Sequence, residues 1–195
     1  MIQADLNKKI RGIYAITPDQ TLELDNIENT IKKYNIQILQ YRRKHLSVNT
    51  QLKEAKRLQQ LCQKHHTLFI INDDINLAQK VKADGVHLGK DDTSIKEARE
   101  LLGENAVIGV SCYNDIDLAK QAQTQGANYV AFGALFPSST KPNAPRCALD
   151  IISQAKQALN IPIVGIGGVD FDNQQQTLDA GCDAVAMIRA LFDDK

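Results

Sequence analysis

The stretch that decides the fold is LFIINDDINLAQKVKADGVHLGKDD, which runs from Leu68 to Asp92. An apolar run of strand length opens it and stops at Asn72-Asp73-Asp74. A short helical pattern then leads to a second strand, Gly85 to Leu88, which is also followed by acidic residues. Parallel strands joined by a helix point their C-terminal ends the same way. We therefore expect Asp73 and Asp92 to face one cleft.

Two carboxylates in one cleft suit a hard cation such as Mg²⁺, which takes one or two carboxylates together with substrate phosphates. A structural alternative stands beside this interpretation. Asp73 or Asp74 could cap the helix that follows, and Asp91 and Asp92 could be solvated turn residues. The stretch taken by itself favours the structural alternative, so the decision rests on the rest of the chain.

The same strand-then-helix pattern extends in both directions from this stretch. Continuous apolar strands, typical of strands buried on both faces, are predicted at residues 12–17, 36–41, 68–71, 85–88, 106–111, 128–133, 162–166 and 184–188. Strict alternation with helices indicates a parallel sheet, and eight units are the number that closes a (β/α)8 TIM barrel. We predict an α/β protein with residues 1–195 forming one compact barrel domain. An open doubly wound sheet is the alternative, although no GxGxxG motif follows the first strand.

Composition excludes several classes of protein. The 23 basic and 23 acidic residues give a formal net charge of +0, which offers no electrostatic reason to expect nucleic acid. No apolar run reaches the length of a membrane span, and the N-terminal residues lack the apolar core of a signal peptide. The four cysteines are widely spaced and form no CxxC pair, which fits a reducing cytosol and gives neither a disulfide scaffold nor a zinc site. A cytoplasmic location is therefore expected.

The predicted strand ends collect the residues of a phosphate and Mg²⁺ site. Active sites of such barrels lie at the C-terminal ends of the strands. Besides Asp73 and Asp92, the polar and glycine residues there are Thr17, Gln40, Arg42, Lys44, Asn72, Ser111, Ser138, Ser139, Thr140, Lys141, Gly167, Gly168 and Arg189. The glycine pair and the start of the last helix form a candidate phosphate cradle.

Each of these residues also has a structural interpretation. Arg42 and Lys44 could be solvated turn charges, and Gln40 and Ser111 could be polar core residues with satisfied hydrogen bonds. The glycine pair could be a tight turn, and the hydroxyls at 138–140 could be ordinary loop residues. His87 is predicted to be a packed, hydrogen-bonded strand residue. The gathering of all the others at one rim favours the functional interpretation.

These motifs resemble the thiamine phosphate synthase family over nearly the whole chain. The family pattern Q-x-R-x-K is present at residues 40–44, I-N-D at 71–73 and G-V-H-L-G-x-x-D at 85–92. Further along, G-x-S is present at 109–111, F-G-x-x-F-x-[ST]-x-T-K at 132–141 and I-G-G at 166–168. Any one of these motifs is weak evidence, but six in order at consecutive strand ends are specific.

The resemblance implies a transferase that condenses 4-amino-2-methyl-5-hydroxymethylpyrimidine diphosphate with 4-methyl-5-(2-phosphooxyethyl)thiazole, with release of pyrophosphate. It implies Mg²⁺ on Asp73 and Asp92. It places the diphosphate on Arg42, Lys44 and Lys141 as the catalytic cations, with Asn72 beside them. It places the pyrimidine on Gln40 and Ser111, and the thiazole phosphate on Ser138, Ser139, Thr140, Gly168, Ile188 and Arg189. Two small-molecule substrates are the expected partners, with no nucleic acid or membrane, and the residues do not decide between a monomer and a homo-oligomer.

Three positions depart from the family pattern. Arg189 stands where many members have a small polar residue, Ser138 replaces a commoner Thr, and Ala134 replaces a common Pro. None of these changes removes a charge that the reaction needs. Two rival functions are a thiazole tautomerase-like relative and a non-catalytic barrel that binds thiamine precursors. The first would be expected to lack the paired aspartates and the loop lysine, and the second to lose the Mg²⁺ ligands.

Overall fold

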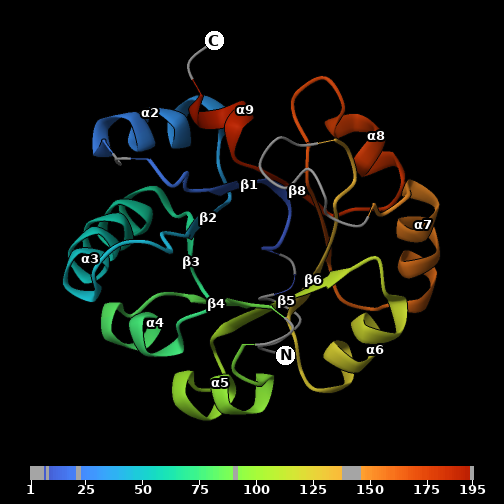
Figure 1. Ribbon diagram of the computed structural model, residues 1–195, viewed down its shortest axis with the longest axis horizontal. Coiled ribbons are helices and arrows are strands. Elements are labelled where there is room, and N and C mark those ends of the chain that lie inside the picture. The colour runs from blue at the N-terminus through green and yellow to red at the C-terminus, as the bar shows by residue number, and fades with distance from the viewer. Residues whose placement is uncertain (1–6, 8, 21–22, 90–91, 138–145, 194–195) are drawn as a thin grey trace.

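The strands close into a parallel barrel in which each strand pairs with the next in the sequence and β8 pairs with β1. The computed structural model describes residues 7, 9–20, 23–89, 92–137 and 146–193. The elements are β1 (Gly12–Ile16), α2 (Leu24–Tyr34), β2 (Ile38–Tyr41), α3 (Val48–His65), β3 (Leu68–Asn72), α4 (Ile75–Val81), β4 (Gly85–Leu88), α5 (Ile95–Leu102), β5 (Val107–Tyr113), α6 (Ile116–Thr124), β6 (Tyr129–Phe132), α7 (Leu149–Ala158), β7 (Ile163–Ile166), α8 (Gln174–Asp179), β8 (Ala184–Met187) and α9 (Arg189–Phe192). The predicted (β/α)8 barrel is confirmed, and Figure 1 shows the helices as a ring around the strands.

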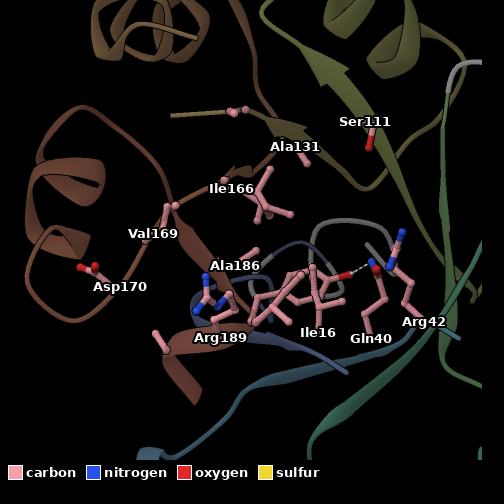
Figure 2. Close-up of a pocket in the computed structure, with 18 of the residues that line it drawn as sticks. Ile16, Gln40, Arg42, Ser111, Ala131, Ile166, Val169, Asp170, Ala186 and Arg189 are labelled. Atoms are coloured by element: carbon pink, nitrogen blue, oxygen red, sulfur yellow. Dashed lines mark hydrogen bonds between the residues drawn. The ribbon is translucent and has the colours of Figure 1, made fainter. Parts of the chain in front are cut away.

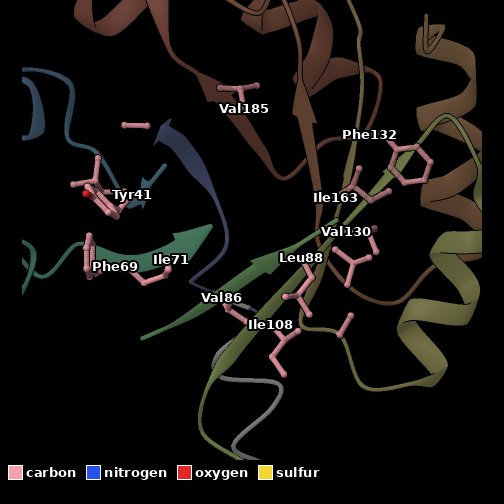
Figure 3. Packing of buried hydrophobic residues seen from close by; sticks show 14 of the residues in the cluster. Tyr41, Phe69, Ile71, Val86, Leu88, Ile108, Val130, Phe132, Ile163 and Val185 are labelled. Carbon is pink, nitrogen blue, oxygen red and sulfur yellow. The ribbon is translucent and has the colours of Figure 1, made fainter. Parts of the chain in front are cut away.

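Alternation along the strands divides the core into two layers, because neighbouring residues of a strand point to opposite faces. The outer layer packs strands against helices and includes Phe69, Ile71, Ile108 and Phe132 (Figure 3). The inner layer fills the barrel with side chains that include Tyr14, Ile38, Ile70, Val107, Tyr129 and Val164. Ile10, which precedes β1, belongs to the inner layer. The interior is therefore packed, and in barrels of this kind the active site is built at the C-terminal ends of the strands.

Serine side chains cap two of the helices. Ser47 accepts a hydrogen bond from the Thr50 backbone at the start of α3, and Ser94 forms a capping box with Glu97 at the start of α5. Helix α8 begins at Gln174, several residues after the glycine pair that follows β7. The reason is local, because the Asp170 carboxylate accepts hydrogen bonds from the backbone of Asp172 and Asn173 and folds that stretch into a turn.

The four cysteines are buried free thiols. Among the residues with described coordinates, no helix is long and apolar enough to cross a membrane.

Candidate active site

A cavity of about 770 Å³ opens at the C-terminal ends of the strands. Seven of the predicted site residues line it, which are Gln40, Arg42, Asn72, Ser111, Gly168, Ile188 and Arg189. Its apolar lining comes from inward-facing strand residues, including Ile16, Ala131, Val164, Ile166 and Ala186. Figure 2 shows Gln40 and Arg42 on one side of the cavity, Ser111 across from them, and Arg189 near Ala186. The cavity is thus polar at the rim and apolar below.

Asp73 and Asp92 lie together beside this cavity. Asp73 follows Asn72, a lining residue, and its carboxyl is within hydrogen-bonding reach of Asp92. Burial and the neighbouring Asp92 carboxylate raise the pKa of Asp73, and Lys44 opposes the shift. Two carboxylates held in contact repel each other unless a proton or a cation is shared between them. The donor set therefore fits Mg²⁺, which also needs oxygen atoms from water or substrate because the described chain supplies no third acidic, His or Cys ligand.

The backbone assigns different tasks to the two adjacent aspartates. Asp74 caps α4, because its carboxylate accepts a hydrogen bond from the Leu77 backbone at 2.8 Å. Asp73 has a left-handed backbone with φ of 64°, and its amide donates to the His87 carbonyl at 2.9 Å. The capping alternative is thus correct for Asp74. Asp92 closes its own turn by accepting from the Gly89 amide at 2.7 Å.

Two cations of the rim, Arg42 and Lys44, are held by carboxylates. Arg42 Nη1 lies 3.1 Å from Asp19 Oδ2, and Lys44 Nζ lies 3.1 Å from Asp73 Oδ2. The Arg42 backbone is fixed by the buried hydroxyl of Thr17, which accepts a hydrogen bond from the Arg42 amide at 2.9 Å. Both ion pairs are partly exposed and hence weak. A diphosphate can therefore compete for these cations at little energetic cost.

Gln40 and Ser111 face the cavity, and their polar atoms are connected to buried neighbours. Gln40 Nε2 donates to the Tyr14 hydroxyl, and Ser111 Oγ lies 2.9 Å from His87 Nε2. The predicted packing of His87 is confirmed: it is 9% exposed, and its other ring nitrogen lies 3.0 Å from the Tyr129 hydroxyl. Burial lowers the pKa of His87 to about 4, so the ring is neutral near pH 7.

The glycine pair after β7 lies against the chain that leaves β6. Gly167 and Gly168 have φ of 94° and 67°, in the left-handed region that favours glycine. A Cβ atom on Gly168 would stand 2.5 Å from the Pro137 carbonyl oxygen. Arg189, at the start of α9, pairs with Asp193 at 2.5 Å and is 60% exposed. Gly167, Gly168 and Arg189 all line the cavity, so the residues of the predicted phosphate cradle lie at the same rim.

Four predicted residues, Ser138, Ser139, Thr140 and Lys141, lie outside the described part of the chain. Sequence reasoning did not assign Tyr14, Tyr129 or Asp19 to the site. Strand alternation carries a signal for Tyr14, because it lies two residues before the rim residue Ile16 and so faces inward. Asp19 gives no such signal, since it lies beyond the end of β1 in an irregular stretch.

The chain is similar over nearly its whole length to known thiamine phosphate synthases. A family model described as thiamine monophosphate synthase matches residues 13–191. The chain is 49% identical over 185 residues to the thiamine-phosphate synthase of Methylobacillus flagellatus, which covers 94% of this chain and 88% of that protein. It is 46% identical over 187 residues to the thiamine-phosphate synthase of Chromobacterium violaceum, covering 95% and 90%. The solved thiamine phosphate pyrophosphorylase of Pyrococcus furiosus superposes with a TM-score of 0.87 at 30% identity, covering 97% and 91%.

Proposed function

The chain belongs to the thiamine monophosphate synthase family, and we propose that it joins 4-amino-2-methyl-5-hydroxymethylpyrimidine diphosphate to 4-methyl-5-(2-phosphooxyethyl)thiazole, giving thiamine phosphate and pyrophosphate. The observation that carries this proposal is the contact between the carboxyl groups of Asp73 and Asp92 next to Lys44 and the cavity. A cation and a diphosphate would complete that arrangement. The two neighbouring ion pairs would open to receive the leaving group.

The proposed reaction breaks a C–O bond of the pyrimidine diphosphate and forms a bond from the thiazole nitrogen to the same carbon. Mg²⁺, held by Asp73 and Asp92, would neutralise charge on the departing diphosphate. Arg42, Lys44 and Lys141 would bind the same group, and Asn72 would donate to it from the cavity wall. Charge grows on the leaving group in the transition state, so fixed cations there lower the barrier.

The described residues also suit a reaction that needs little proton transfer. His87 has both ring nitrogens engaged and a lowered pKa. Burial raises the pKa of the Cys112 thiol, and the side chain is inaccessible to solvent. Neither residue is poised as a base or a nucleophile. The apolar lining around Ile166 and Ala131 would exclude water from a reactive pyrimidine methyl cation.

The thiazole phosphate would bind on the other side of the cavity. Gly168 and the Ile188–Arg189 turn are assigned to it, together with Ser138, Ser139 and Thr140 from the stretch after Pro137. Two anion sites on opposite sides would keep the substrates apart and hold the thiazole ring over the pyrimidine methylene carbon. Such positioning supplies much of the rate in a bimolecular reaction.

The deciding experiment is a coupling assay with purified protein, both substrates and Mg²⁺, read out as thiamine phosphate, with and without EDTA. We expect product that disappears on chelation and returns with added Mg²⁺. Lys44→Met should lower turnover on the order of a hundredfold. Lys53→Met, on an exposed position of α3, is the matched control. Binding of both substrates without product would instead support the non-catalytic barrel, and conversion of the thiazole alone would support the tautomerase-like relative.

A further inference from the structure

A continuous chain of hydrogen bonds crosses the barrel interior below the cavity. Gln40 Nε2 donates to the Tyr14 hydroxyl at 2.8 Å, and that hydroxyl lies 2.8 Å from the Tyr129 hydroxyl. The Tyr129 hydroxyl lies 3.0 Å from His87 Nδ1, and His87 Nε2 lies 2.9 Å from Ser111 Oγ. We call these five residues the interior chain. It connects, through the core, the two residues assigned to the pyrimidine.

The need to pair every buried hydroxyl hydrogen selects the direction of the bonds in the interior chain. The three links from Gln40 to His87 Nδ1 need three hydrogens. The Gln40 amide supplies the first. The Tyr14 hydroxyl oxygen could also accept from Tyr129, but the buried hydrogen of Tyr14 would then be unpaired. The order that pairs every hydrogen has Tyr14 donating to Tyr129 and Tyr129 donating to His87. His87 Nδ1 therefore accepts and carries no hydrogen. The ring proton lies on Nε2 and is donated to Ser111.

The ends of the interior chain then have fixed and opposite roles toward the cavity. One amide hydrogen of Gln40 is donated to Tyr14, which fixes the orientation of the amide and turns its oxygen Oε1 away from Tyr14, where it can accept from a ligand in the cavity. Ser111 Oγ accepts from His87, which leaves its hydroxyl hydrogen to be donated to a ligand. An isolated glutamine amide can rotate and offer either group. Here a rotated Gln40 would turn its oxygen toward Tyr14, whose hydrogen is already donated to Tyr129.

The packing leaves the tyrosines no room to avoid this constraint. Tyr14 is 1% exposed and Tyr129 is fully buried, so an unpaired hydroxyl there would not reach water. Gly109 makes room for the Tyr129 ring, since a Cβ atom on Gly109 would stand 2.0 Å from Tyr129 Cζ. Rotating Gln40 therefore requires reversing all the bonds of the interior chain at once.

We propose that the interior chain is a specificity device that makes Gln40 a hydrogen-bond acceptor and Ser111 a donor, and so selects a 4-aminopyrimidine over its 4-oxo counterpart. The amino group would donate to Gln40 Oε1, and a ring nitrogen would accept from Ser111. A 4-oxo group would instead place a carbonyl oxygen against Gln40 Oε1. In this device Tyr14, Tyr129 and His87 are positioning residues. The choice of pyrimidine rests on the proposed function, but the order of the bonds does not.

The direction of the bonds is tested first, on the wild-type protein without substrate. Nitrogen-15 NMR of the histidine ring reports which nitrogen is protonated, and the His87 signals are assigned by their loss in His87→Gln. We expect a neutral ring with the proton on Nε2. A proton on Nδ1 would mean that the interior chain runs the other way and would overturn the proposal, whether or not the protein makes thiamine phosphate.

The specificity is tested with Tyr129→Phe, which removes the central hydroxyl and keeps the ring. The measured quantity is the ratio of inhibition by the 4-oxo pyrimidine diphosphate to the KM of the 4-amino substrate. In Tyr129→Phe the Tyr14 hydroxyl is free to donate to a rotated Gln40, so we expect the preference for the amino compound to fall roughly tenfold or more. The His87 ring should also become a mixture of the Nδ1-protonated and Nε2-protonated tautomers.

The matched control is Tyr41→Phe. Tyr41 is buried and follows Gln40 in β2, but its side chain belongs to the outer layer. Its hydroxyl donates to Glu54 at 2.8 Å, away from the interior chain. It should keep the wild-type preference and the wild-type His87 signal. If Tyr129→Phe keeps the full amino preference, or if Tyr41→Phe loses as much, the interior chain does not set specificity. If wild-type protein shows the Nε2 proton but no coupling activity, only the proposed function fails.

Discussion

Replacing Asp73 by asparagine tests the proposed metal site most directly. The substitution keeps the size of the side chain and removes one of the two charges that face each other. The backbone of Asp73 is left-handed, with φ of 64°, and asparagine tolerates that conformation as well as aspartate does. The variant should therefore fold normally and differ from wild type in its response to Mg²⁺.

The size of the effect follows from the contacts of Asp73. Without Mg²⁺, the variant loses an ion pair with Lys44 whose side chains are 50% and 28% exposed, and it gains relief from repulsion by Asp92. These opposing changes should leave the free energy of unfolding within about 1 kcal/mol of wild type. Mg²⁺ at about ten times its Kd should stabilise the wild type by roughly 1.4 kcal/mol. For a chain of 195 residues that is a Tm increase of about 3–6 °C.

The assay is thermal unfolding of wild type and variants in EDTA and in a Mg²⁺ series. Asp73→Asn should lose most of the Mg²⁺-dependent increase in Tm and most of the coupling activity. Asp74→Asn is the control, because it makes the same change one residue along, at a helix cap where asparagine serves as well. Asp74→Asn should keep the Tm increase. An unchanged Mg²⁺ response in Asp73→Asn would show that the ion binds elsewhere.

Three further predictions concern the thiazole side and the core. Gly168→Ala should lower the free energy of unfolding by about 2–3 kcal/mol and raise the KM for thiazole phosphate, because the added Cβ would stand 2.5 Å from the Pro137 carbonyl oxygen. The control is Gly103→Ala, where φ is also positive but the Cβ would meet no other atom; chemical denaturation should show a loss of only about 1 kcal/mol. Arg189→Ser should raise the KM for thiazole phosphate roughly three- to tenfold, with the free energy of unfolding unchanged within about 0.5 kcal/mol because the ion pair of Arg189 is exposed. An unchanged KM would mean that the guanidinium stays paired with Asp193 and does not bind the phosphate. Since the pKa of His87 is lowered from 6.5 to about 4, its neutral form stabilises the fold above pH 6.5, and this contribution is lost as pH falls toward 4. The difference in unfolding free energy between wild type and His87→Gln should shrink by up to about 3 kcal/mol between pH 7 and 4, and a constant difference would contradict the assigned burial effect.

The site could be predicted from the sequence only as a set of candidates. The order of motifs placed Gln40, Arg42, Asn72 and Ser111 at strand ends, and the barrel brings all four to one cavity. The residues by themselves left Asp73 and Asp74 both open as helix caps, and it was the family resemblance that selected Asp73 for the metal. The left-handed turn at residue 73 decides between them, by directing one carboxylate toward Asp92 and the other to α4.

The sequence by itself determined the barrel, because the alternation of apolar strands and amphipathic helices is a local pattern that each segment carries on its own. It also determined the family, since the motifs are read in order along the chain. Only the tertiary structure decided which polar groups meet. Tyr14 and Tyr129 are 115 residues apart, yet their hydroxyls lie 2.8 Å from each other inside the barrel. That contact depends on closure and on the register of eight strands, and no local pattern encodes it.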